Sequence, residues 1–506
     1  MLRPARSHLQ YQRFVIDELH IFGLLGIKPF ADELQWITAF LCCDLSPIYA
    51  ALLDTYSTLG RPALDPCDLF RSLLLMTFLG YESLDDWVDI MRRNPLYAIV
   101  SGFDPKHVPG ATTLRDLIDR LYDYENRHER RKARKKLRRF RTKPTKKYKK
   151  GEKAPPRHPQ IVAKLAARFV KGRLAGGRPE DTMNHILKQC FVMPSAQLGL
   201  LGNTQELILS GDGSQYKSGA NPLGRKVCDC RKKGIYNCKC PRRFPDPDAS
   251  WGWDSYRGNY IYGYAAYELT AVGGKYDLPA YILFAACQRH DSVSGLVTLD
   301  RVYQVYPEFS LRYFLGDSAH DALEFYRYLH HHNTLPIIDL NSRNKGKNTL
   351  LGDITIDELG HPVCSKGLPM VYDGACHGRS RIKWVCPLAE RGKHKPECAC
   401  TASTYGRTFY TKPDDDPRLH TQPPRGSADW KVLMAKRSGS ERSNSRKKAD
   451  LNLKNTRIRC SHRRFVQISM AGMVQHMNAW IKEAVANRGP VAAMLQQLMP
   501  LLPVVA

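Results

Sequence analysis

Two aspartates, each preceded by a glycine, follow short apolar runs, and together they could support metal-dependent chemistry. Asp212 follows the run 207–210, and Asp317 follows the run 311–315. If each run is a strand that ends at its acid, paired strands would hold the two carboxylates side by side. Carboxylate oxygens suit Mg²⁺, and two such ions suit an in-line phosphoryl displacement. Taken alone, each acid is better explained by a turn after a strand, because Asp and Gly are common turn residues.

Cysteines form a second group of candidate metal ligands. The chain has 15 cysteines, and in a cytosolic protein they favour thiols or metal ligands over disulfides. A loop of thirteen residues contains four of them, as two Cys-x-Cys pairs: Cys228, Cys230, Cys238 and Cys240. Four thiolates can hold one structural Zn²⁺ tetrahedrally, and the basic residues around them would lower the thiol pKa values. Cys-x-x-Cys is the commoner zinc spacing, so free thiols are an equal alternative.

A later stretch has five more cysteines with histidines nearby, which allow too many combinations to name a ligand set. Its members are Cys364, Cys376, Cys386, Cys398, Cys400, His361, His377 and His394.

The net charge points to a polyanionic partner. Lysine and arginine total 77 against 49 acidic residues, which gives a formal charge of +28. Nucleic acid is the first candidate, and the basic runs Arg130–Arg139 and Lys146–Lys150 would contact phosphates without reading sequence. An anionic membrane is the competitor, but no apolar stretch has the length of a spanning helix and no signal peptide is recognisable. We therefore expect a cytoplasmic protein that binds nucleic acid.

The elements that would position these residues divide the chain into regions. Helical periodicity predicts an all-helical N-terminal domain over 1–126, with helix starts at Asp65 and at Thr112–Thr113. A basic linker follows over 127–159, as a solvated arm or an exposed helix.

Residues 160–340 begin with helices and then predict three strands, a helix, a strand, a helix and a strand. This order implies a mixed sheet covered by helices, as in ribonuclease-H-like folds. A cysteine-containing β-rich or irregular module is expected over 341–429. Over 430–490 we expect a strand at 430–436, a charged helix and apolar helical packing that closes the core, before a tail at 491–506. Trp251, Trp253, Tyr256 and Arg257 could stack on bases, although packing at a strand entrance explains them better.

At this point the sequence resembles the DDE transposases of bacterial insertion sequences, in the group with a β-rich insertion between the second and third acids. The first two acids of the family match Asp212 and Asp317. The third lies on a helix in a tyrosine, arginine, glutamate and lysine signature, which Arg437, Glu441 and Lys448 fit by spacing. Met434 stands at the tyrosine position. The N-terminal helical pattern also looks like the domain that precedes the catalytic domain in such transposases.

The resemblance implies a DNA strand transferase with a two-metal mechanism. Asp212, Asp317 and Glu441 would bind two Mg²⁺ or Mn²⁺ ions, while Arg437 and Lys448 would contact phosphates beside the cut. Family behaviour suggests a homodimer on paired element ends. A metal-dependent nuclease of the same fold without strand transfer, and a catalytically inactive DNA-binding derivative, are the alternatives. His320 and Asp321 are further candidates near the second acid, and a helix N-terminal cap explains Asp321 better.

Overall fold

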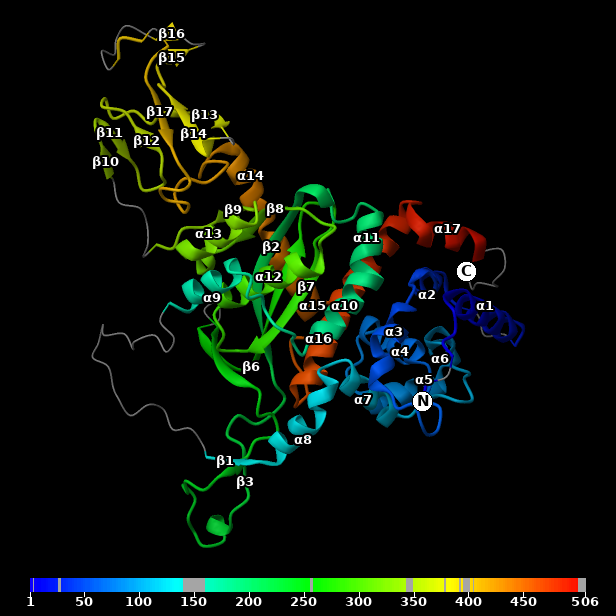
Figure 1. The fold of residues 1–506 in the computed structure, drawn as a ribbon. Coiled ribbons are helices and arrows are strands. Elements are labelled where there is room, and N and C mark those ends of the chain that lie inside the picture. The colour runs from blue at the N-terminus through cyan, green and yellow to red at the C-terminus, as the bar shows by residue number, and fades with distance from the viewer. Residues whose placement is uncertain are drawn as a thin grey trace.

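A mixed sheet with helices on both faces forms the centre of the molecule (Figure 1). The computed structural model describes residues 1–2, 4–25, 29–139, 160–254, 258–342, 349–376, 379–390, 393–394, 401–403 and 405–498. The sheet has six strands in the order β5-β6-β2-β8-β9, with β7 also paired to β6. They are β2 (Leu207–Lys217), β5 (Ser250–Asp254), β6 (Asn259–Ala271), β7 (Leu278–Ala286), β8 (Leu311–Gly316) and β9 (Leu335–Ile338). The strand β8 pairs in parallel with β2 and with β9, and the other pairs are antiparallel.

The predicted order of strands and helices in this region is confirmed. Helix α12 (Asp291–Val305) stands between β7 and β8, and α13 (Leu323–His331) stands between β8 and β9. Helix α13 joins the adjacent parallel strands β8 and β9, and α12 joins the parallel strands β7 and β8 across β6 and β2, so both are crossover connections. The strand β5 was not predicted, and it contains Trp251 and Trp253 beside β6.

The expectation that the first strand ends at Asp212 is wrong. Strand β2 continues to Lys217, because β6 pairs with it without interruption from Leu209 to Lys217. Its glycines are therefore extended strand residues, and Asp212 lies in the middle of the strand.

The N-terminal region over 1–126 is helical, as predicted, and the basic linker begins with an exposed helix, α8 (Arg127–Lys135). The N-terminal helices are α1 (His8–Leu24), α2 (Ala31–Cys42), α3 (Pro47–Leu52), α4 (Pro66–Phe78), α5 (Leu84–Arg93), α6 (Pro95–Ser101) and α7 (Ala111–Arg120). Asp65 caps α4 by accepting a hydrogen bond from the Cys67 amide, as expected. The expected start of α7 at Thr112–Thr113 is wrong, because Gly110 is its N-cap and both threonines lie inside the helix.

Helix α16 (Ser461–Val485) joins the helical region to the sheet. It packs against α4 and α2 on one side and against β7 on the other. Its Gly472 faces Ile282 of β7, while Met473 and Met477 are fully buried. One continuous hydrophobic core therefore includes both the helical region and the sheet.

The segment 430–436, predicted as a strand, is helical. Helix α14 (Ala428–Lys436) begins after Ser427, whose side chain accepts a hydrogen bond from the Trp430 amide. Leu433 and Met434 pack beside Val272 and Leu315, so the apolar residues serve a helix face instead of a strand. Helix α15 (Ser438–Ala449) follows directly.

Between β9 and α14 the described residues form short strands, in line with the expected β-rich module. These are β10 (Thr349–Leu351), β11 (Ile354–Ile356), β12 (Pro362–Val363), β13 (Val371–Cys376), β14 (Arg381–Val385), β15 (Ala389–Glu390), β16 (Lys393–His394) and β17 (Thr408–Thr411). They have a small core of their own around Trp384 and Ile382. The module is tied to the sheet region by Arg418, which binds both carboxylate oxygens of Asp321 at 2.9 and 2.8 Å. Asp321 is therefore not the helix cap that we expected.

Within the described residues, no single helix is long and apolar enough to cross a membrane. The bent pair Asp32–Cys42 and Pro47–Thr55, at 61°, passes the length and composition test together.

Candidate metal centres

The register of two parallel strands places Asp212 beside Asp317. The last paired residues of β2 and β8 are Ser210 and Leu315, and each aspartate lies two residues beyond its paired residue. Neighbouring strands run about 4.8 Å apart. The structure thus brings together two acids that lie far apart in the sequence.

The glycines around Asp212 are required by close packing. A side chain at Gly211 would collide with the hydroxyl of Tyr267 and with Phe314, and one at Gly213 would collide with the carboxylate of Asp291. Neither glycine has a positive φ, so the motif is a site of close approach instead of a turn.

Tyr267 and Asp291 pack against the glycines on one face of β2. Helix α15 lies on the opposite face, toward which the Asp212 side chain points. Ser440 and Ser210 are hydrogen-bonded through their hydroxyls at 2.9 Å. One turn later Ser443 donates to Glu268 at 2.6 Å, and Lys447 forms a fully buried ion pair with the same carboxylate. Glu268 is the cross-strand partner of Asp212 in β6. These contacts at positions i, i+3 and i+7 fix the rotation of the helix over the site.

The neighbouring stripe of α15 carries Arg437, Glu441, Asn444 and Lys448. The Asn444 amide donates to Oδ2 of Asp212 at 2.9 Å. Glu441 stands one turn earlier with a side chain that is 53 % exposed, and it forms an ion pair with Arg437 at 2.8 Å. The ammonium of Lys448 lies 5.2 Å from the ring centre of Tyr216. The three signature residues therefore share one helix face beside the first acid.

The pKa of Asp212 is raised by burial and by three neighbouring carboxylates. Burial raises the pKa of Asp212 to about 6, the Asn444 hydrogen bond opposes this, and the carboxylates of Asp291, Asp317 and Glu441 raise it further. A bound divalent cation would relieve this repulsion, and an oxygen-only donor set suits Mg²⁺. The residues present therefore fit such an ion. Within the described residues, these carboxylates are not gathered within 4.8 Å of one another.

Asp317 is oriented by a buried histidine. Nδ1 of His320 donates to Oδ1 of Asp317 at 2.8 Å, and its Nε2 accepts from the Tyr267 hydroxyl at 2.7 Å. Burial acts to raise the pKa of Asp317, but the His320 hydrogen bond, the Ala319 amide and Arg437 hold it below its ordinary value. The two aspartates thus differ, since one is held ionised and the other resists ionisation.

Asp291 is a fourth carboxylate that the sequence analysis missed. It is the first residue of α12, and its carboxylate packs over Gly213. Burial raises the pKa of Asp291; His320 opposes this shift and Asp317 adds to it. The signal was available, because His290-Asp291-Ser292 follows a strand and opens a helix, as the second acid does.

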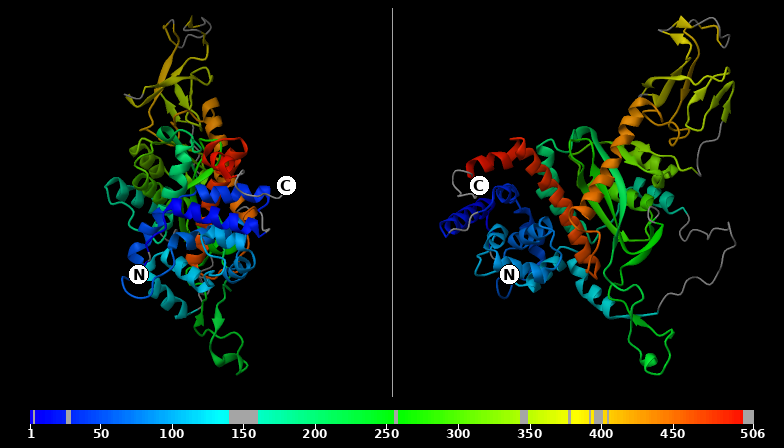
Figure 2. Two further views of the ribbon diagram at one scale, coloured as in Figure 1. Left: turned by 90° about the vertical axis from the view of Figure 1, so that its right-hand side faces the viewer. Right: turned by 180° about the vertical axis from the view of Figure 1, so that it is seen from behind.

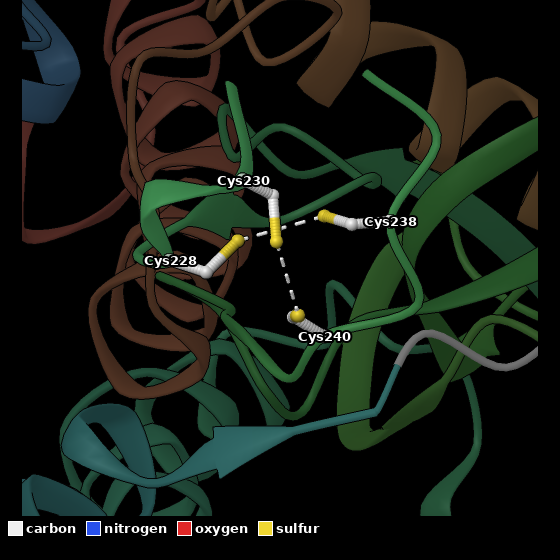
Figure 3. Close-up of side chains that lie close together, drawn as sticks. All are labelled: Cys228, Cys230, Cys238 and Cys240. Atoms are coloured by element: carbon white, nitrogen blue, oxygen red, sulfur yellow. Dashed lines mark hydrogen bonds between the residues drawn. The ribbon is translucent and has the colours of Figure 1, made fainter. Parts of the chain in front are cut away.

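The four cysteines of the predicted zinc site converge, with their sulfurs pointing toward one another (Figure 3). All four sulfurs lie within 4.8 Å, with 3.5 Å between Cys228 and Cys238 and 3.6 Å between Cys230 and Cys240. A tetrahedral zinc site with Zn–S of about 2.3 Å needs sulfurs about 3.8 Å apart, whereas a disulfide needs about 2.05 Å. The cluster could therefore bind one Zn²⁺. The Cys230 amide and the neighbouring thiols lower the pKa of Cys228 to about 7, which favours a first thiolate.

The other predicted groups are less complete. Cys364 and Cys386 are buried and Cys376 is exposed; within the described residues none of them joins a metal-ligand group. His377, Cys398, Cys400, Tyr256, Arg257 and the run Lys146–Lys150 lie outside the described residues. Trp251 and Trp253 pack against Tyr262 and Tyr260 of β6, with ring centres 5.4 and 4.9 Å apart, as expected at a strand entrance, but they stay about half exposed, at 49 % and 52 %.

Comparison with known families adds one finding. Residues 28–120 match the family described as Transposase domain (DUF772). The match lies within the N-terminal helical region and indicates a transposition-related DNA activity. No curated protein matches the chain.

Proposed function

We propose that this chain is a DDE transposase with a ribonuclease-H-like catalytic domain, which cuts the ends of an insertion sequence and joins them to target DNA. The observation that carries the proposal is the β2–β8 register, which sets Asp212 beside Asp317. Asn444 binds Asp212, and this contact brings Glu441 to the same edge. The transposase domain over 28–120 supports the proposal independently of the acids.

In this proposal Asp212, Asp317 and Glu441 hold two Mg²⁺ or Mn²⁺ ions. Such ions, when bound, activate the attacking oxygen and neutralise the leaving one. The protein's own groups position these carboxylates: Asn444 orients Asp212, and His320 orients Asp317.

Arg437 and Lys448, one turn and two turns from Glu441, would contact the phosphates beside the cut. The Arg437–Glu441 ion pair holds the arginine at the edge of the site. The charge of +28 agrees with a double-stranded DNA partner.

We assign residues 1–126 to a DNA-binding and assembly domain. Residues 160–340 and 430–490 would form the catalytic domain, with 341–429 as its insertion. A homodimer would hold paired ends, and the protein would act in the bacterial cytoplasm on nucleoid DNA.

The test is a strand-transfer assay. Purified protein is incubated with Mg²⁺, a supercoiled plasmid and a linear fragment that ends in the inverted repeats flanking its gene. A transposase joins the fragment to the plasmid, and Asp212→Asn abolishes joining. Cleavage without joined products would indicate the nuclease, and unchanged activity of Asp212→Asn would overturn the carboxylate site.

A further inference from the structure

A basic finger, residues 225–243, projects from the end of the molecule opposite to the strands β10–β17 (Figure 2). It consists of β3 (Arg225–Lys226), the four-cysteine loop and β4 (Arg242–Arg243). It contains eight lysines and arginines and one aspartate. None of its side chains is buried, so the finger adds nothing to the core. Its shape therefore depends on the pairing of β3 with β4 and on the cysteine cluster.

The finger is continuous with the basic segment that follows the N-terminal region. Strand β1 (Leu137–Arg138) pairs with β4 and completes a three-stranded sheet. Behind it, Arg134 of α8 donates to the Pro245 carbonyl at 3.0 Å. The β1–β4 pairing and the Arg134 hydrogen bond thus hold the basic residues of α8 and of the finger together as one surface.

On its other side α8 borders a cleft of about 580 Å³. Eight arginines line this cleft, including Arg130 and Arg134 from α8 and Arg457 and Arg463 from the opposite wall. Four acids also line it, and two of them are already paired: Asp119 with Arg131 at 2.9 Å and Asp85 with Arg115 at 2.5 Å. The cleft therefore has an excess of positive charge that its own acids do not neutralise.

The finger and the cleft both lie beyond the end of the strand that carries Asp212. From Asp212 to Lys217, β2 spans about 17 Å at roughly 3.3 Å per residue. Just beyond it, the Gly219 amide donates to the Ile458 carbonyl at 2.8 Å, which ties the cleft wall to the strand. This distance is about half of one turn of B-DNA, whose turn is roughly 34 Å.

We propose that the finger, α8 and the arginine-lined cleft form a binding surface for the phosphate backbone of a DNA duplex, with one Zn²⁺ on the four cysteines holding the finger in shape. The inference rests on the proposed function, because the duplex is the one whose end reaches the carboxylates. Duplex DNA presents one negative charge per about 1.7 Å of axis. An extended row of cations therefore suits a duplex better than it suits a compact anion. One Zn²⁺ with four thiolates has a net charge of −2. The eight lysines and arginines of the finger outnumber this charge and that of its aspartate, so the zinc-loaded finger stays basic.

The tip of the finger carries apolar groups that folding does not use. Ile235 is 53 % exposed and Tyr236 is 64 % exposed. Apolar side chains at the end of a basic projection fit contacts with the sugars and base edges of a groove. The surrounding lysines would supply the binding energy, and the tip would set the depth of insertion.

The test removes charge from the finger without touching its cysteines. A triple variant carries Lys232→Gln, Lys233→Gln and Lys239→Gln, and its matched control carries Lys164→Gln, Lys171→Gln and Lys482→Gln, which are exposed elsewhere. Fluorescence anisotropy with a 40-base-pair duplex, from 50 to 300 mM salt, gives the affinity and its salt dependence.

The finger variant should bind about 10 to 100-fold more weakly near 150 mM salt, and the slope of log K against log salt should fall by about 3. In the control the decrease in slope should be less than half as large. Both variants should match wild type in zinc content and melting temperature. Equal slopes for the two variants, or a preference for RNA of the same length, would overturn the inference. The finger variant should still join DNA ends at saturating protein and low salt, because its carboxylates are unchanged. This result separates the binding surface from the proposed function. If the variant binds weakly as expected but wild type joins nothing, only the proposed function fails.

Discussion

The side-chain amide of Asn444 donates a hydrogen bond of 2.9 Å to Oδ2 of Asp212, across 232 positions of sequence. It joins the helix that carries Glu441 directly to the first acid, beside the Ser440–Ser210 hydrogen bond that also links this helix to β2. An amide satisfies the carboxylate without neutralising it, so the negative charge remains available to a cation. Asn444 is therefore positioned to orient Asp212.

We expect Asn444→Ala to lower the rate of end joining roughly 10 to 100-fold, as the loss of a group that orients a metal ligand typically does. The midpoint for Mg²⁺ activation should rise by a similar factor. Ser445→Ala, on an exposed position of the same helix, is the matched control. Mg²⁺ titrations of joining activity measure both effects, and an unchanged midpoint in Asn444→Ala would show that the hydrogen bond does not orient a ligand.

The raised pKa of Asp212 predicts a stability effect with a definite sign. Its pKa is about 6 in the folded protein against an ordinary value of 3.8, so the folded state resists ionisation. Metal-free wild type should therefore lose stability as pH rises from about 4 to 6, by on the order of 2 kcal/mol. Asp212→Asn should abolish this loss. Scanning fluorimetry in EDTA should show the variant melting a few degrees above wild type at pH 7.5 and together with it at pH 4.

Adding Mg²⁺ at pH 7.5 should reverse that order. Wild type gains stability from a bound cation, by about 2.7 kcal/mol at one hundred times the dissociation constant, whereas Asp212→Asn should gain little. A wild-type melting temperature that ignores Mg²⁺ and Mn²⁺ would contradict the carboxylate site.

The sequence was sufficient to predict the mixed sheet because period and length separate its strands from its helices. It was misleading where glycine has two explanations. Gly211 and Gly213 looked like turn residues, but the packing of Tyr267 and Asp291 against them requires the missing side chains. Such contacts join distant parts of the chain and leave no local pattern.

The same limit applies to helix α14 and to the core. Leu433 and Met434 are apolar because they face the sheet, and a short apolar run does not distinguish a strand from one buried helix face. The buried ion pair of Glu268 and Lys447 could not be predicted either. In the sequence each residue looks like an ordinary surface charge, and only the packing of α15 on β6 brings them together.

We expect Lys447→Met to destabilise the protein by about 3–5 kcal/mol, because it leaves the buried carboxylate of Glu268 without its cation. Adding Glu268→Gln should recover most of the loss, since the paired change removes both charges. Urea unfolding followed by tryptophan fluorescence measures both variants. A single variant as stable as wild type would show that the pair does not anchor α15.

The cysteine cluster predicts about one zinc per chain in purified protein by elemental analysis. Cys238→Ser with Cys240→Ser should abolish it, whereas Cys376→Ser, at an exposed cysteine outside the cluster, should not. Because the finger has no buried side chains, the melting temperature of the body should change by no more than about a degree. Zinc-free wild-type protein would remove the tetrahedral site.

Asp291 gives the sharpest test of how many acids the site uses. Within the described residues its carboxylate forms no hydrogen bond or ion pair, and it lies in the field of Asp212 and Asp317. If it binds metal, Asp291→Asn should raise the Mg²⁺ midpoint in the thermal titration roughly 10 to 100-fold. If it only favours the start of α12, the change should leave that midpoint unmoved. Asp86→Asn, at an exposed acid in the first turn of α5, reports the helix effect alone, so a shift in Asp291→Asn that it does not share would assign Asp291 to the metal centre.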